Sequence, residues 1–294
     1  DEGFRPDYPK PEAEKTALRG VLRELSADVV ALQEIGGEPF ARELQRDLAA
    51  EGLAYPHLAA MLAQDEARGL AVLSRRAPRE VRRHDDLEFE WGDGTERVRR
   101  GLLEVAWAAE ATDAATDADA GGAAGAGGEL RLFVVHLKSR RTEDAADPPA
   151  ARLRAAEATA VRERIIRCMA EVAGEPVALA ARPDDAGTAE KRPRRAVAGR
   201  FLIVGDLNAG PTERPVEALT ARGQLTIATW LDAADARGHR WTHAHRPEAS
   251  YARLDHVLAS AALAPAVRRV WIVDTPEVAL ASDHRPLAVT LAWP

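Results

Sequence analysis

The chain has 294 residues, with 40 lysines and arginines against 47 aspartates and glutamates, a formal net charge of −7 that argues against broad, sequence-independent binding to polyanions. Cys168 is the only cysteine, so an internal disulfide and a zinc–thiolate cluster are excluded. No run of eighteen apolar residues predicts a transmembrane helix, and the length suits one α/β domain over residues 1–294, which we expect to be monomeric.

Helices and strands are predicted from the spacing of apolar residues, which differs between a helix and a strand. In chain order the pattern predicts a helix over 16–26, a strand over 28–34, a helix over 39–50, strands over 69–75, 79–84, 99–107 and 129–137, a helix over 151–172, and strands over 201–204, 225–230, 251–260, 267–273 and 285–293.

Two segments lack the pattern of either element. Residues 109–128 are of low complexity and contain no large apolar side chain, and residues 182–199 are rich in proline and arginine. We interpret both as flexible loop insertions within one domain, because the strands on either side belong to one series of motifs.

Several of the apolar strands end in polar residues that a protein core would not accommodate. They are Glu34, His136, Asp206, Asn208, Asp255, Asp283 and His284. Ligand sites gather at strand ends in open α/β sheets, so these ends predict one shared site. Alternate residues of an extended segment point to the same side, which places Asp206 and Asn208 together.

The residue types in this set indicate the chemistry of the site. Buried carboxylates are costly unless they are paired or bind a metal, and an oxygen-rich set suits Mg²⁺ or Mn²⁺ better than zinc. A histidine oriented by a carboxylate can take a proton from water. Cations such as Lys138 and Arg140 can stabilise a pentacovalent phosphorus. The residues therefore predict metal-assisted hydrolysis of a phosphate ester.

An ordered series of short motifs resembles one known family. "LQE", "GLAVLSR", "HLKSR", "GDLN", "RLDHVL" and "SDHRPL" appear in the order typical of the endonuclease/exonuclease/phosphatase superfamily, over almost the whole chain. The resemblance implies the DNase I-like fold, a four-layer α/β/β/α sandwich in which helices flank two packed, mostly antiparallel sheets. It also implies a phosphate-ester substrate, with nucleic acid among the candidates.

The resemblance assigns expected roles to individual residues. Glu34 is similar to the principal metal ligand of the family, and Asp283 to a further ligand of the metal or its water. Asp206 and Asn208 resemble the pair that positions the attacking water and contacts the phosphate. His284 resembles the catalytic histidine oriented by Asp255. His136 matches a position that faces the phosphate, and Lys138 is a candidate substrate contact.

The sequence departs from the family at two places. Members usually begin with a strand that carries a metal-associated asparagine, whereas residues 1–12 have no strand pattern. We therefore expect the first family strand to be missing from the chain as given. His256 stands where the family commonly has an aromatic residue. Its side chain should face away from that of Asp255, so we expect little effect on the chemistry.

Three histidines close together, His239, His243 and His245, could suggest a zinc site. No further ligand is evident in the sequence, so a zinc site is not predicted.

The most favoured function is that of a Mg²⁺-dependent phosphodiesterase or nuclease. A phosphatase acting on inositol phosphates or lipid head groups would use the same residues, and a non-catalytic binding module of the same fold is the alternative from another class. The sequence does not decide between the cytoplasm and export.

Overall fold

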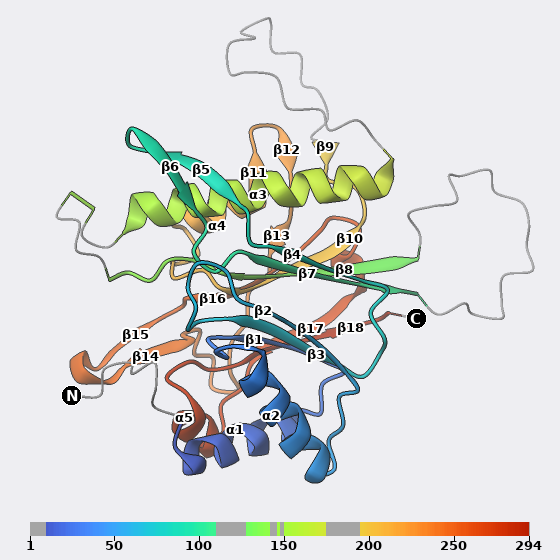
Figure 1. Cartoon of the computed structure of the whole chain (residues 1–294), viewed down its shortest axis with the longest axis vertical. Coiled ribbons are helices and arrows are strands. Elements are labelled where there is room, and N and C mark those ends of the chain that lie inside the picture. Colours follow the sequence, from blue (N-terminus) through green and yellow to red (C-terminus); the bar gives the residue numbers. More distant parts are fainter. Residues whose placement is uncertain (1–9, 110–127, 142–145, 148–149, 175–194, 294) are drawn as a thin grey trace, which may run out of the picture.

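The computed structural model describes residues 10–109, 128–141, 146–147, 150–174 and 195–293, which form four stacked layers (Figure 1). Two β layers lie face to face in the middle. One carries helix α3 on its outer side, and the other carries helices α1, α2 and α5. This is the layer order of the predicted sandwich. Within the described ranges, no helix is both long and apolar enough to cross a bilayer.

The larger sheet has six strands in the order β13-β16-β10-β8-β7-β4. They are β4 (Glu80–His84), β7 (Leu102–Ala108), β8 (Glu129–His136), β10 (Arg200–Asp206), β13 (Thr229–Trp230) and β16 (Asp255–Ala259). Only β8 and β10 run parallel, so the sheet is mostly antiparallel as predicted. Its outer face buries Phe133 and Phe201 under α3 (Ala151–Ala173) and the short α4 (Arg214–Thr220).

The second β layer is divided into two sheets, β1-β3-β2 and β17-β18. Its strands are β1 (Val29–Gln33), β2 (His57–Met61), β3 (Leu70–Ser74), β17 (Val267–Ile272) and β18 (Leu287–Leu291). Its outer helices are α1 (Glu12–Leu25), α2 (Glu38–Ala50) and α5 (Pro276–Ala281). A core that includes Val72, Leu103 and Val134 joins the two β layers. Helices α1 and α5 pack together, and Val21 of α1 is buried against Val278 of α5.

Strands β1 and β18 each have one edge to which no strand of the described residues is hydrogen-bonded. Every residue of β1 is only half-buried, whereas every residue of its neighbour β3 is buried. The strands of the second β layer do not form a continuous ladder, and its two sheets are held side by side by the core shared with the larger sheet and by the packing of α1 on α5.

The remaining elements are short and lie around the sandwich. They are the hairpin β5 (Glu88–Trp91) and β6 (Gly94–Arg97), the small sheet of β9 (Arg195–Ala196), β11 (Ala221–Arg222) and β12 (Leu225–Thr226), the pair β14 (His243–His245) and β15 (Ser250–Ala252), and the 3₁₀ turns Arg246–Glu248 and Ala264–Ala266. The pair β14–β15 is important for the site, because it reaches the same edge of the sandwich as the polar strand ends.

The structure corrects some predicted elements. The predicted strand over 225–230 is two strands in different sheets, β12 and β13, and the one over 251–260 is likewise divided into β15 and β16. The first helix begins at Glu12, four residues earlier than predicted. Strand β2, the β5–β6 hairpin and the short helices α4 and α5 were not predicted. Helices this short depend on tertiary packing more than on their own sequence.

The two predicted loop insertions are described only in part. Residues 110–127 of the first lie outside the described residues, as do residues 182–194 of the second. The described end of the second, residues 195–199, includes strand β9, which pairs in parallel with β12. The prediction of flexible insertions in a single domain therefore stays a prediction.

Candidate active site

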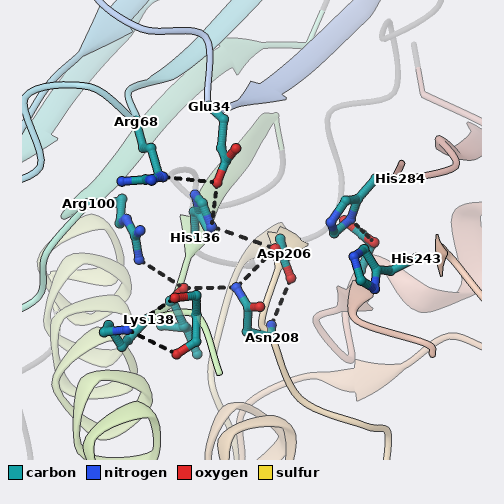
Figure 2. A network of polar contacts seen from close by, with 12 residues as sticks. Glu34, Arg68, Arg100, His136, Lys138, Asp206, Asn208, His243 and His284 are labelled. Carbon is teal, nitrogen blue, oxygen red and sulfur yellow. Dashed lines mark hydrogen bonds and ion pairs between the residues drawn. The ribbon is translucent and has the colours of Figure 1, made fainter. Parts of the chain in front are cut away.

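The predicted polar strand ends meet at one edge of the two β layers (Figure 2). In the parallel pair β8/β10, His136 lies opposite Asp206, and in the antiparallel pair β10/β16, Asp206 lies opposite Asp255. Glu34 directly follows β1, and His284 lies between α5 and β18. Five segments that are far apart in the chain therefore bring these side chains together.

Asn208 holds Asp206 at the end of β10. The backbone N–H of Asn208 donates to Oδ1 of Asp206 at 2.8 Å, and the side-chain amide donates to Oδ2 at 3.0 Å. The same amide donates to the carbonyl of Leu137 at 3.1 Å. Asn208 has a φ of 49°, in the left-handed region that asparagine enters more readily than most residues. Because both amide hydrogens are used, the side chain of Asn208 fixes Asp206 against the end of β8.

His136 lies between the carboxylates of Glu34 and Asp206. Its Nε2 is 3.8 Å from Oε1 of Glu34 and 3.6 Å from Oδ2 of Asp206. Its Nδ1 is buried and has no hydrogen-bond partner among the described residues. Burial, together with the nearby Arg100 guanidinium, lowers the pKa of His136 to about 3. The imidazole is therefore neutral at physiological pH and can donate one hydrogen bond.

Glu34 has a strained backbone and a charged neighbour. Its φ of 56° is unusual for a residue other than glycine, and such strain is concentrated at functional sites. Nε of Arg68 lies 3.4 Å from Oε1 of Glu34, and Arg68 also pairs with Asp65 at 3.2 Å. Arg100 in turn pairs with Asp65 at 3.0 Å and donates to the carbonyl of Leu137 at 3.3 Å. This chain of charges links Glu34 to the end of β8.

His284 and Asp255 form a hydrogen-bonded pair on the other side of the site. Nδ1 of His284 is 2.8 Å from Oδ2 of Asp255. Burial opposes the charged form of His284, but the carboxylate of Asp255 outweighs it and raises the pKa of His284 to about 10. Burial likewise opposes the charged form of Asp255, but the imidazolium of His284 lowers the pKa of Asp255 below its ordinary value. The pair is thus an oriented histidine–carboxylate dyad.

Asp206 carries a charge that is poorly compensated. Burial, followed by repulsion from Asp255, raises the pKa of Asp206 to about 7. Ligand atoms of Asp206, Asp255 and His284 lie within 4.8 Å of one another, so two buried carboxylates share one histidine. Such an arrangement favours the uptake of positive charge between the carboxylates.

The two remaining predicted residues lie at the margin of the site. Asp283 is exposed, and its Oδ2 is 3.8 Å from Nε2 of His243. The ammonium of Lys138 is bound within its own loop by Oγ and the carbonyl of Ser139, at 3.0 and 3.2 Å, and by the carbonyl of Arg141. In Figure 2 the side chain of Lys138 lies away from His284 and His243. The structure therefore brings Asp283 towards the dyad and holds Lys138 apart from it.

Comparison with known proteins decides the family. A model described as the Endonuclease/Exonuclease/phosphatase family matches residues 2–284. The chain belongs to this family. Comparison with curated proteins gives no match.

Solved structures of low sequence identity share the fold of this family member. A functionally unknown conserved protein from Enterococcus faecalis V583 aligns with a TM-score of 0.56 at 15% identity, over 96% of this chain and 91% of the other. The human Nocturnin catalytic domain aligns with a TM-score of 0.53 at 15% identity, over 97% of this chain and 89% of the other. A 3′-5′ exonuclease (NExo) from Neisseria meningitidis aligns with a TM-score of 0.52 at 16% identity, over 96% of both chains. The predicted DNase I-like α/β fold is confirmed.

The side chains of this endonuclease/exonuclease/phosphatase family member fit a divalent cation. Glu34 and Asp206 approach the same nitrogen of His136, and Asp206 lacks compensation for its charge. Carboxylate oxygens are the donors that hard cations such as Mg²⁺ and Mn²⁺ prefer. An exposed Glu34 beside a buried Asp206 provides such donors together with access from solvent.

Sequence reasoning missed the residues that support the site from behind. Asp65, Arg68 and Arg100 form the chain of charges to Glu34, and the hydroxyl of Thr242 accepts the backbone N–H of Asp255 at 3.0 Å. Asp65 and Arg68 precede the "GLAVLSR" strand, and Arg100 opens the "RRGLLEV" strand. Their position beside those motifs was the one signal in the sequence that they support the site. It was not used, because a charged residue beside a strand is usually exposed to solvent.

His256, the residue in the aromatic position of the family, faces away from the dyad as predicted. Its Nδ1 accepts the indole N–H of Trp230 at 2.9 Å, so its Nε2 carries the proton that it donates to the carbonyl of Ala209 at 2.7 Å. His256 is fully buried, and burial lowers its pKa to about 4. It thereby anchors the turn that follows Asn208.

We expect the substitution His256→Phe to lower the free energy of unfolding by about 1–3 kcal/mol. It leaves the indole N–H of Trp230 and the carbonyl of Ala209 buried without partners. Urea unfolding monitored by tryptophan fluorescence measures the change. His57→Phe, on the half-buried strand β2, is the matched control. An equal loss in both variants would show that the turn does not depend on His256.

Proposed function

We propose that the chain is a divalent-metal-dependent phosphodiesterase in which His284 activates water. The family is named after endonucleases, exonucleases and phosphatases, which all hydrolyse phosphate esters. The observation that carries the proposal is the dyad, because Asp255 orients His284 at 2.8 Å within 4.8 Å of the carboxylate of Asp206.

His284 is the proposed general base. Its Nδ1 is bound to Asp255, which fixes the tautomer and leaves Nε2 to accept a proton from water. The raised pKa of His284 reflects the carboxylates of Asp255, Asp206 and Asp283 around it. Offsetting that negative charge with a divalent cation lowers the pKa towards the range in which the imidazole is neutral. Base catalysis and cation binding are therefore linked by electrostatics.

Glu34 is the proposed principal ligand of Mg²⁺ or Mn²⁺, with Asp283 as a further ligand of the ion or its water. When bound, the ion supplies Lewis-acid polarisation of a phosphoryl oxygen. Asp206 is proposed to accept a hydrogen bond from the attacking water. The neutral His136 donates to a phosphate oxygen. Asn208 keeps Asp206 in place by donating one amide hydrogen to its carboxylate and the other to the carbonyl of Leu137.

The substrate is proposed to be a phosphodiester, with nucleic acid as the first candidate. NExo, which has the same fold, is a 3′-5′ exonuclease. Arg140, next to the site, donates to the carbonyl of Asn208 at 3.1 Å and pairs with Glu213 at 2.7 Å, so its charge is already in use. Lys138 is also bound within its loop, and we propose that it contacts substrate only after releasing Ser139.

Hydrolysis of two model substrates tests this proposal. We expect bis-p-nitrophenyl phosphate to be hydrolysed in the presence of Mg²⁺ or Mn²⁺ and not in EDTA. Turnover of p-nitrophenyl phosphate without the diester would indicate a phosphatase of the kind that acts on inositol phosphates or lipid head groups. No turnover of either ester with any divalent ion would instead favour a binding module.

We expect the substitution Glu34→Gln to raise the Mg²⁺ concentration needed for half-maximal activity at least about tenfold, since even the outer partners of metal ligands contribute about 10–100-fold to affinity. Titration of activity with Mg²⁺ measures the shift. Glu38→Gln is the matched control, because this exposed glutamate pairs with Arg42 within α2. An unchanged Mg²⁺ requirement in Glu34→Gln would contradict the assignment of Glu34 as a ligand.

A further inference from the structure

A second group of possible metal ligands lies beside the dyad. One donor atom from each of His243, Asp283 and His284 can be chosen so that all three lie within 4.8 Å of one another. Nε2 of His243 is 3.8 Å from Oδ2 of Asp283, and the rings of His243 and His284 are 4.6 Å apart. Figure 2 shows the two histidines next to each other.

The backbone fixes the three residues relative to one another. His243 and His284 form an antiparallel β-bridge between β14 and the segment before β18. The N–H of Ala244 donates to the carbonyl of Asp283 at 2.9 Å, and the N–H of Arg285 donates to the carbonyl of Thr242 at 2.6 Å. These bonds hold the three residues beside one another, with donor atoms close enough to share one ion.

The donor types in this group differ from those around Glu34. Two imidazole nitrogens and one carboxylate oxygen form a set typical of zinc sites that keep one position open, whereas Mg²⁺ prefers oxygen donors. His284 also donates its other ring N–H to Asp255, and histidines that bind a metal almost always donate that N–H to a carboxylate, a backbone carbonyl or water. The side chain of Asp283 is 63% exposed, which leaves the group open to ions from solvent.

We propose that His243, Asp283 and His284 bind a Zn²⁺ ion at the margin of the active site. Asp283 and His284 also belong to the proposed catalytic site. Zn²⁺ bound to this group therefore occupies the free nitrogen of His284, which would otherwise accept the proton from water. It also takes Asp283 from the Mg²⁺ ion. Zn²⁺ at this site therefore inhibits hydrolysis, a consequence that rests on the proposed function.

Zinc binding is tested without reference to activity. Isothermal titration of the full chain with Zn²⁺ in millimolar Mg²⁺ should show one site, which in His243→Gln is weakened at least about tenfold. His245→Gln is the matched control, because this histidine is on the same strand but its nearest carboxylate is Glu248, at 3.4 Å. We expect the affinity of His245→Gln for Zn²⁺ to equal that of the unaltered chain.

Two binding results would overturn the proposal. One is an equal affinity for Zn²⁺ in His243→Gln and the unaltered chain. The other is a loss of binding in Cys168→Ser instead, which would place the ion in the buried group of His84, Glu104 and Cys168. Circular dichroism establishes that each variant is folded.

Inhibition is tested separately. With each variant normalised to its own Mg²⁺-dependent rate, the Zn²⁺ concentration that halves hydrolysis should rise in His243→Gln by the same factor as the dissociation constant. Zn²⁺ that binds as expected but leaves the rate unchanged would overturn the inhibitory role. Absence of any hydrolysis would count against the proposed function and leave the binding result intact.

Discussion

Replacing His284 with glutamine is expected to lower the kcat for bis-p-nitrophenyl phosphate by about 10²–10⁴-fold, the usual contribution of a general base. Glutamine keeps a polar side chain of similar reach but has no nitrogen that can accept a proton near neutral pH. Because His284 is partly exposed, the substitution removes the base without opening a cavity in the core. Initial rates at saturating Mg²⁺ measure the change.

The dependence of His284 on Asp255 provides an internal control. Asp255→Asn should also lower kcat, because the hydrogen bond of 2.8 Å that orients the imidazole is weakened. Residues that act as one unit have non-additive effects, so the double variant should be little slower than His284→Gln alone. A rate for His284→Gln within a few-fold of the unaltered chain would remove His284 from the mechanism. Fully additive effects would show that Asp255 acts independently.

Replacing Asp235 with alanine is expected to lower the free energy of unfolding by about 3–5 kcal/mol, the usual cost of removing one partner of a buried ion pair. The side chain of Asp235 is fully buried, and its Oδ2 accepts a hydrogen bond from Nη2 of Arg285 at 2.6 Å. Its Oδ1 accepts the backbone N–H groups of Arg237 and His239 at 2.8 and 2.9 Å. The substitution leaves the buried guanidinium of Arg285 with Asp274, at 3.2 Å, as its remaining carboxylate partner, beside the carbonyl and ring of Trp241.

A nearby aspartate is the matched control for this prediction. Asp232 pairs with Arg240 at 3.0 Å with both side chains exposed, and it lies 4.0 Å from the guanidinium of Arg253, at the outer limit of an ion pair. Exposed pairs contribute about 0–1 kcal/mol. Unfolding in guanidinium chloride should therefore show only a small change in the free energy of unfolding of Asp232→Ala. Similar changes for the two alanine variants would contradict the importance of the buried pair. Because Arg285 is adjacent to His284, Asp235→Ala should also increase hydrogen exchange in the "SDHR" segment.

The sequence indicated which polar residues would lie together, but it did not indicate every strand of the sheets. Polar residues at the ends of apolar strands were recognisable one strand at a time, and the order of the motifs implied that Glu34, Asp206 and His284 meet. Strand β2, of sequence HLAAM, has no large apolar side chain apart from leucine and methionine, and it becomes a strand because β3 pairs with it in register. In such strands, tertiary contacts determine the structure more than the intrinsic strand propensity of the residues does.

Side-chain orientation and long-range partners could not be predicted from local patterns. The sequence places Lys138 two residues after His136, but the carbonyl groups that bind its ammonium arise from the path of the loop. The histidines of "WTHAH" showed no third zinc ligand within reach in the sequence. Asp283 and His284, forty residues later, become neighbours of His243 only through the β-bridge. Contacts of this kind depend on the whole fold.

The division of the second β layer has a consequence for the width of the active site. Glu34 extends from β1, and His284 leads into β18, and no backbone hydrogen bond within the described residues joins these two strands. Both strands pack on the larger sheet through one apolar core, which includes Val29 of β1 and Val289 of β18, and Val21 of α1 also packs on Val278 of α5. Apolar contacts are not directional, whereas a hydrogen-bonded ladder fixes spacing. The spacing between Glu34 and His284 therefore depends on apolar packing, and substitutions in that packing should change the width of the site.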